Sequence, residues 1–161
     1  MAMVRPNFFS LNLMIGGKTG HKGFQAREIA ADVLVNALAK HYQDTQVIRN
    51  PEWADLVKTA SLKQLAPANN NWWYIRAAAV TRQIYLHHDA SLSGLAFHYG
   101  ANMKAVTMPK HHHEASRKVI RTILQQLEKA GLVRVAEKGR QLTPKGQKLL
   151  DQIANGCGKK L

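Results

Sequence analysis

The chain has 161 residues, of which 23 are lysine or arginine and 10 are aspartate or glutamate, giving a formal net charge of +13. Hydrophobic residues make up 45% of the sequence, enough to form one packed domain and too many for a wholly disordered chain. No apolar run approaches the roughly 18 residues of a membrane span, and the single cysteine, Cys157, excludes an intrachain disulfide. Such a cationic excess disfavours the compact state unless a polyanion offsets it, so the composition favours a nucleic-acid partner.

The N-terminal part of the chain divides into an extension and a first helix. Residues 1–24 are rich in glycine and basic residues, and we expect a flexible extension. Because no acidic residue precedes Glu28, this extension also resembles an organelle transit peptide, although its glycines would interrupt the required amphipathic helix. From Gln25 to His41 the apolar residues approximate helical spacing, which predicts the first amphipathic helix.

A short second helix is predicted to begin at Pro51 and to end near Lys58. Asn50 can cap it, and Pro51 suits the first helical position, where its missing N–H costs nothing. The apolar residues expected to face the core are Trp53, Leu56 and Val57.

The third predicted helix follows three asparagines and carries apolar residues nearly all round, so we expect it to be the buried hub of the domain. One stripe of this hub consists of Trp73, Ala77, Val80 and Ile84. Arg76 and Arg82 are six residues apart and cannot share a helix face, so each should reach an edge of the hub. There they could pair with Glu52 or Asp55, or emerge on a basic surface that contacts phosphates.

The next segments predict a short helix, a basic loop and a strongly amphipathic helix. The short helix spans Ser91 to Tyr99, the loop Ala101 to His113, and the amphipathic helix Glu114 to Ala130 with Gly131 ending it. In the amphipathic helix the core positions are Ile120, Ile123, Leu124 and Leu127, and the opposite side carries Arg117, Lys118 and Arg121. These three cations are either an ordinary solvated face or a phosphate-contact surface.

A β-hairpin and a last helix complete the pattern. Strands at 132–135 and 141–143 flank a turn at 137–140, and Thr143-Pro144 begins a helix with Leu149, Leu150 and Ile153 facing inward. We therefore predict a mainly α, winged helix-turn-helix-like domain over residues 25–154, with a small β-hairpin wing and an extra N-terminal helical part. Residues 155–161 are expected to form a loose basic tail.

The residues expected to contact nucleic acid are Arg76, Arg82, Lys104, Lys110, Arg117, Lys118, Arg121, Lys138, Arg140 and Lys145. The wing tip, Lys138-Gly139-Arg140, is either an ordinary polar turn or a phosphate contact. His111-His112-His113 does not have the spacing of a metal site, so neither a metal nor a cofactor is expected. No nucleophile elbow, phosphate-binding glycine loop or HExxH motif is present, and nothing indicates a small-molecule substrate or a membrane partner.

A series of short motifs resembles one known family. The motifs are Pro51-Glu52-Trp53, Leu65-Ala66-Pro67, Asn71-Trp72-Trp73-Tyr74-Ile75-Arg76-Ala77-Ala78, Met108-Pro109 and Leu142-Thr143-Pro144-Lys145-Gly146-Gln147. In this order and spacing the chain resembles, roughly from Glu28 to Ala154, the small-subunit ribosomal protein nineteen family of eukaryotes and archaea. The resemblance implies a winged-helix-like, non-enzymatic protein of the small-subunit head that binds small-subunit rRNA and supports rRNA maturation and subunit assembly.

The resemblance also implies neighbouring ribosomal proteins of the head as partners, and a cytoplasmic location with nucleolar assembly in a eukaryote. It maps the family's basic surface onto Arg76, Arg82 and Arg121, with Arg117 at a position that tends to be basic. Three features depart from the family pattern: the long extension before Gln25, Thr122 where a second arginine is common, and His112-His113-Glu114 in place of a short polar stretch.

Two other functions fit the residues alone. A winged-helix transcription regulator would place Arg117, Lys118 and Arg121 in the major groove of duplex DNA and the wing on the adjacent backbone. An RNA-processing enzyme or cofactor is the third interpretation, and it would retain activity when purified away from ribosomes.

Overall fold

The computed structural model describes residues 23–88, 90–103, 107 and 109–158, and within these ranges the chain is mainly helical. In chain order the elements are α1 (Ala31–Thr45), the 3-10 helix η2 (Glu52–Leu56), α2 (Trp72–Leu86), α3 (Leu92–His98), β1 (Ala101–Asn102), β2 (His112–His113), α4 (Arg117–Lys129), β3 (Val133–Ala136), β4 (Gly139–Leu142) and α5 (Pro144–Gly158). The succession from α3 to α5 confirms the predicted winged-helix-like fold with a β-hairpin wing. No helix in the described ranges is both long and apolar enough to cross a membrane.

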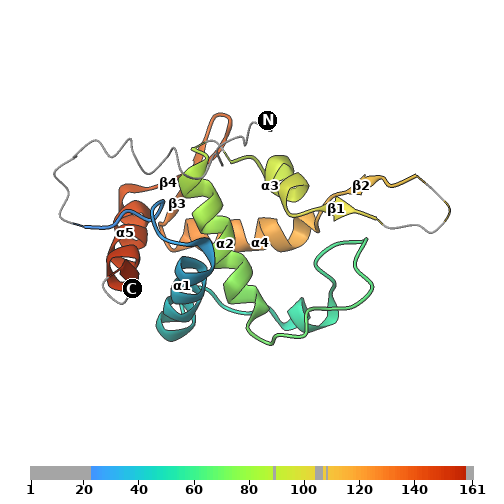
Figure 1. Ribbon diagram of the computed structural model, residues 1–161, viewed down its shortest axis with the longest axis horizontal. Helices are drawn as coiled ribbons and strands as arrows, with labels where there is room; N and C mark the ends of the chain where they lie inside the picture. Colours follow the sequence, from blue (N-terminus) through green and yellow to red (C-terminus); the bar gives the residue numbers. More distant parts are fainter. Residues whose placement is uncertain (1–22, 89, 104–106, 108, 159–161) are drawn as a thin grey trace, which may run out of the picture.

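Helix α2 is the hub of the fold, as the sequence predicts. It runs through the centre of the molecule, with α1 and α5 on one side and α3 on the other, and α4 crosses it (Figure 1). The predicted stripe is fully or almost fully buried, at Trp73, Ala77, Val80 and Ile84. The core positions predicted for α4 are buried as well, and they belong to the same hydrophobic core as the stripe of α2.

Trp73 fixes the point where α2, α4 and the segment after α1 meet. Its ring is fully buried and packs edge-on against Trp53 and Trp72, with ring centroids 5.5 and 5.4 Å away. Its indole N–H donates to Gln126 Oε1 at 3.3 Å, and the Gln126 amide donates to the carbonyl of Arg49 at 2.9 Å. The indole therefore supplies both apolar contact and a polar link to α4.

A buried hydroxyl pair joins α1 to α2. The Thr81 hydroxyl donates to the carbonyl of Ala77 at 2.9 Å, which leaves its oxygen to accept from the Tyr42 hydroxyl at 3.1 Å. Burial raises the pKa of Tyr42 to about 12, although the hydrogen bond to Thr81 acts in the opposite direction. Both polar groups are thus satisfied inside the core, as buried groups must be.

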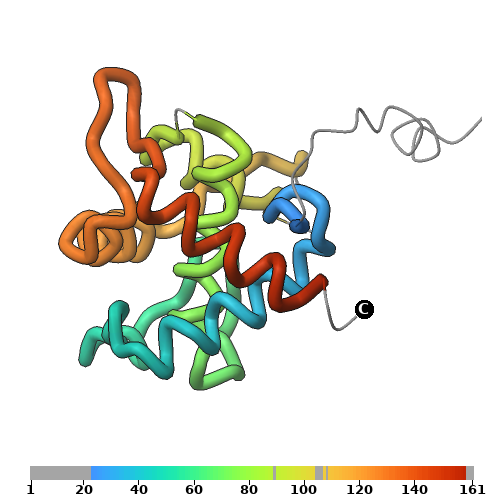
Figure 2. The backbone as a smooth tube through the Cα atoms, turned by 90° about the vertical axis from the view of Figure 1, so that its left-hand side faces the viewer, coloured from blue at the N-terminus to red at the C-terminus, as the bar shows by residue number. Residues whose placement is uncertain are grey.

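The wing is tied to the segment before α3. Strands β3 and β4 pair antiparallel, from Val133 opposite Leu142 to Ala136 opposite Gly139. Beyond this hairpin, Ala90 and Arg140 exchange backbone hydrogen bonds of 3.3 and 3.0 Å. The hairpin projects from the body of the molecule next to the start of α5 (Figure 2).

The predicted N-terminal boundaries differ from those observed. Helix α1 begins at Ala31 and not at Gln25, because residues 25–28 form a turn in which the Glu28 carboxylate accepts from the Gln25 N–H at 3.1 Å. The second helix is a single 3-10 stretch, and Asn50 makes no side-chain cap at its start. Leu56 was expected to face the core and is instead 85% exposed, because it is the last residue of a short helix that buries Ala54.

Helix α5 is longer than the sequence indicates. It continues through Gly158 with Cys157 buried, so the loose tail predicted from residue 155 is wrong for residues 155–158. The chain near the N-terminus covers this helix, and Asp151 accepts both the Ala26 N–H at 3.2 Å and the Tyr85 hydroxyl at 3.1 Å. Residues 1–22 of the predicted extension and 159–161 of the tail lie outside the described residues.

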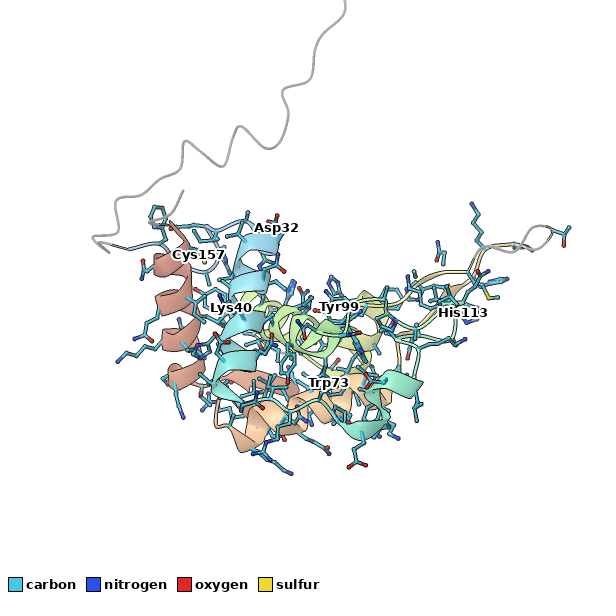
Figure 3. The ribbon with its side chains drawn as sticks, turned by 90° about the horizontal axis from the view of Figure 1, so that it is seen from below. Asp32, Lys40, Trp73, Tyr99, His113 and Cys157 are labelled. Atoms are coloured by element: carbon cyan, nitrogen blue, oxygen red, sulfur yellow. The ribbon has the colours of Figure 1, made fainter. Side chains whose placement is uncertain are left out.

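The basic loop before α4 contains a second hairpin, which was not predicted from the sequence. Ala101 pairs with His113 and Asn102 with His112, and the Met103 N–H donates to the His111 carbonyl at 3.0 Å. This hairpin extends away from the core at the end of the molecule opposite α5 (Figure 1). His113 and Cys157 consequently lie near the two ends of the long axis (Figure 3).

Replacing Trp73 with alanine should lower the free energy of unfolding by about 3–5 kcal/mol, because it opens a cavity at the junction of three segments. Urea denaturation of Trp73→Ala would measure this loss. The matched control is Val135→Ala, which truncates a valine that is 69% exposed and should stay within about 0.5 kcal/mol of the parent. Similar midpoints for the two variants would contradict the assigned role of Trp73.

Replacing Thr81 with valine should cost about 1–3 kcal/mol, because the Tyr42 hydroxyl stays buried and loses its acceptor. The double variant Thr81→Val/Tyr42→Phe removes both partners and should be more stable than the two single losses added together. Denaturation of the single and double variants tests this coupling. Strict additivity would show that the two hydroxyls do not depend on each other.

Candidate nucleic-acid interface

The exposed side of α4 carries the cations that the sequence placed there. Arg117, Lys118 and Arg121 are all exposed, and the opposite side of the helix packs into the core. Each apolar contact on the inner side therefore helps to fix the direction of a cation on the outer side. This part of the prediction, the amphipathic division of α4, is confirmed.

The three cations of α4 have different neighbours. Arg117 forms an exposed ion pair with Glu114, with Nη2 and Oε2 2.7 Å apart, so its charge is partly offset locally. Lys118 lies over the Trp53 ring, 4.7 Å from the centroid, which orients the ammonium without neutralising it. Arg121 forms no ion pair with any carboxylate of the described residues. The outer side of α4 thus presents Lys118 and Arg121 as uncompensated charges.

The Arg76 side chain extends from α2 and packs beside the end of α3. Its guanidinium lies 4.4 Å from the centroid of the Tyr99 ring, the residue that follows α3, and burial lowers the pKa of Arg76 while Tyr99 opposes that shift. No ion pair with Glu52 or Asp55 occurs, so the alternative of an internal carboxylate partner is wrong for this arginine.

Arg82 also acts electrostatically on this tyrosine. Burial raises the pKa of Tyr99 to about 12, although the positive charges of Arg76 and Arg82 act in the opposite direction. The two arginines therefore act electrostatically on one hydroxyl, although they are six residues apart on α2. The Arg82 Nε is buried and forms no hydrogen bond with any of the described residues, so Arg82 also lacks the carboxylate partner that was considered for it.

A hollow of about 440 Å³ lies beside Arg76. Arg76 and Tyr99 line it together with Thr59 and Lys63, and the Thr59 carbonyl accepts from the Ser116 N–H, one residue before α4, at 2.9 Å. Lys63 was not among the sequence-predicted residues. It lies on an irregular connection without periodicity, so only its charge could have suggested it.

The wing contributes less free charge than expected. Arg140 Nε donates to Glu128 Oε1 at 2.6 Å, with about a quarter of each side chain exposed, so Arg140 connects the wing to α4. Gly139 adopts a φ of +155°, and a Cβ there would lie 2.8 Å from the Ala90 carbonyl oxygen. The glycine therefore allows a close approach to the chain before α3. From the sequence, this turn was expected to be either an ordinary polar turn or a phosphate contact. Lys138 is exposed.

The remaining predicted cations lie apart from one another. Lys110 is exposed beside β2, and Lys104 lies outside the described residues. Lys145 is exposed at the start of α5, and its Nζ is 3.5 Å from the carbonyl oxygen of Ala130, directly after α4. Lys145 thus belongs to the far end of α4, away from Arg117.

The hairpin β1–β2 brings together an aromatic pair on the surface of the protein. The ring of His112 stacks on that of Phe97, with centroids 4.2 Å apart and an interplanar angle of 31°, and Phe97 is 61% exposed. This pair was not predicted from the sequence, because no strands were expected in the loop that precedes α4. In the described residues no group of three or more His, Cys, Asp or Glu side chains could hold a metal ion.

The arrangement is suited to binding a polyanion. Cations lie on a convex helix, on a neighbouring arginine pair and on a projecting hairpin, and all of them are attached to one rigid core. Phosphate oxygens accept readily from lysine and arginine, and an exposed aromatic stack offers a surface to an unpaired base.

Comparison with known proteins identifies the family of this chain. The family model described as Ribosomal protein S19e matches residues 25–160. Small ribosomal subunit protein eS19 of Entamoeba histolytica is 40% identical over 134 residues, covering 83% of this chain and 86% of the relative. Proteins eS19B and eS19A of Schizosaccharomyces pombe are each 35% identical over 133 residues, covering 82% of this chain and 93% and 92% of the relatives. The chain therefore belongs to the S19e family of ribosomal proteins, whose members are structural components and not enzymes.

Proposed function

We propose that this protein is a structural constituent of the small ribosomal subunit that binds small-subunit rRNA and holds it in a fixed arrangement in the subunit head. It supports rRNA maturation and subunit assembly, in the nucleolus of a eukaryote, and then remains on cytoplasmic ribosomes beside neighbouring ribosomal proteins of the head. The observation that carries this proposal is the uncompensated charge of Lys118 and Arg121 on the outer side of α4. The inner side of this helix is buried in the core, which fixes the positions of both cations.

The proposed mechanism is electrostatic and geometric. Lysine and arginine side chains neutralise phosphates and release counterions, which supplies affinity without reading sequence. The deep groove of A-form RNA hides its base edges, so recognition depends on the shape of the folded backbone. Lys118 and Arg121 supply two such charges, and their spacing on one helix selects phosphates at a matching distance.

Arg76 and Arg82 supply a second contact of different character. The Arg76 guanidinium is already half-buried on Tyr99, so little solvent remains to be displaced when a phosphate binds. The unbonded Nε of Arg82 favours a rearrangement in which a phosphate oxygen accepts from it. Lys110, Lys138 and Arg117 extend the same positive field around these contacts, and Lys104 is proposed to add to it. We assign Arg140 a bracing role through Glu128.

Sedimentation of native protein tests the ribosomal role directly. On a sucrose gradient of a lysate from its own cells at moderate salt, the protein should migrate with small subunits, whole ribosomes and polysomes. A constitutive component co-migrates with all three. Recovery only at the top of the gradient would contradict the proposal, and duplex-DNA binding by such material would favour a winged-helix regulator.

Reversing the charge of Arg121 should weaken RNA binding without unfolding the protein, because its side chain lies on the exposed side of α4. For Arg121→Glu we expect a roughly tenfold loss of affinity for a small-subunit rRNA transcript and a salt slope lower by about one. Filter binding across a salt series would measure both quantities, and circular dichroism would monitor the fold.

The matched control is Lys40→Glu, an equal change of charge at an exposed lysine of α1 (Figure 3). It should change the affinity by less than about threefold, because the long-range field alone is altered. Equal losses in the two variants would mean that net charge, and not the outer side of α4, determines binding. An unfolded Arg121→Glu protein would contradict the surface role of Arg121.

A further inference from the structure

A hollow of about 850 Å³ lies at the C-terminal end of α4, away from Arg117 and the β1–β2 hairpin. Helix α5, the last turn of α4 and the chain after α1 form its walls. We call it the α4–α5 groove and define it by four cations, Arg49, Lys129, Lys145 and Lys148, and by two apolar side chains, Val47 and Leu149. Its volume is that of a ligand-binding cleft and is large enough for several side chains.

The groove combines positive charge with apolar side chains. Within the described part of the chain no aspartate or glutamate lines it, so its four cations face no opposing carboxylate there. Val47 is 38% exposed, which places it among the few large apolar side chains that the described fold leaves open to solvent. Exposed apolar surface rimmed by polar residues marks an interaction site more often than isolated exposure does.

The groove is also preformed. The Gln126 side chain holds the Arg49 carbonyl at 2.9 Å, which fastens the chain after α1 to α4. At the other wall, Lys145 Nζ lies 3.5 Å from the Ala130 carbonyl oxygen. A ligand therefore meets walls that are already connected, which lowers the entropy cost of binding.

Charge excludes two possible occupants. The first 22 residues of this chain contain no acidic residue and carry Arg5, Lys18 and Lys22, so they do not complement the groove. A second copy of the chain would bring another formal charge of +13 against it. We therefore expect the groove to bind a separate, negatively charged partner.

The lining distinguishes between a protein and RNA as that partner. Bases are held by stacking on aromatic rings, and among the described residues His41 is the single aromatic side chain that lines the groove, which is too few for a stacking platform. Val47 and Leu149 instead suit the aliphatic or aromatic side chain of a peptide. We propose that the α4–α5 groove binds an acidic peptide segment of a partner protein, with its carboxylates on the four cations and an apolar side chain on Val47 and Leu149. This proposal does not rest on the rRNA contact.

The test is fluorescence anisotropy with the full chain and a labelled peptide of about twelve residues, in which Glu and Asp are interspersed with Leu and Phe. Two matched peptides replace the acids with Gln and Asn, or the apolar residues with serine. Each should bind at least about tenfold more weakly if charge and apolar contact are both required. Equal binding of the serine peptide would overturn the proposal, as would an absence of binding by the parent peptide.

Protein variants locate the site. Lys129→Glu/Lys148→Glu changes two exposed lysines of the groove and should weaken peptide binding by about tenfold or more. Lys40→Glu/Lys58→Glu makes the same change of net charge at exposed lysines outside the groove and should alter the affinity by less than about threefold. Val47→Ser should weaken the parent peptide and leave the serine peptide unchanged. Equal losses in the two double variants would overturn the proposal.

A single-stranded U12 RNA serves as the competing probe. We expect its affinity to fall to the same extent in both double variants, since only the overall field changes. A selective loss of U12 binding in Lys129→Glu/Lys148→Glu would overturn the peptide proposal and make the groove an RNA site. Because this experiment uses no rRNA and leaves Arg121 unchanged, its result is independent of the proposed rRNA contact.

Discussion

The burial of α2 on nearly all sides is the constraint on which the rest of the structure depends. A helix that contacts neighbours all round can hold polar groups only where they bond internally or reach an edge. The Thr81 hydroxyl bonds internally, to the Ala77 carbonyl and the Tyr42 hydroxyl. The Arg76 guanidinium instead reaches an edge of the helix, where it packs on the Tyr99 ring. The hub therefore organises the core and also sends cationic side chains outward at fixed positions.

Ion pairs within the described residues offset little of the positive charge on the surface around this hub. In the described residues the ion pairs are Arg117–Glu114 and Arg140–Glu128, and the first is exposed and so contributes little. The chain as a whole carries a formal charge of +13. Self-repulsion of this size is relieved by salt or by a bound polyanion. The charge that costs the isolated protein stability thus favours its bound state.

The sequence predicted the parts of the fold that depend on periodicity and missed those that depend on distant contacts. Burial of Trp73 and of the inner side of α4 follows from apolar spacing alone. The extension of α5 to Gly158 does not, because its glycines indicate a loose tail and the covering chain comes from the other end of the sequence. Arg140 was predicted as a free cation of the wing, and only the fold brings Glu128 within 2.6 Å of it. The same holds for the joint electrostatic effect of Arg76 and Arg82 on Tyr99.

The two ends of α4 differ in shape more than in charge, and shape determines which partner each can take. Near Arg121 the cations lie on a convex helix surface, where a broad phosphate backbone can approach from outside. Near Lys129 they line a hollow together with the aliphatic side chains of Val47 and Leu149. A side chain of a flexible peptide can contact these aliphatic groups while its carboxylates pair with the cations. One amphipathic helix, fixed by a single core, therefore offers two surfaces that need not compete for the same ligand.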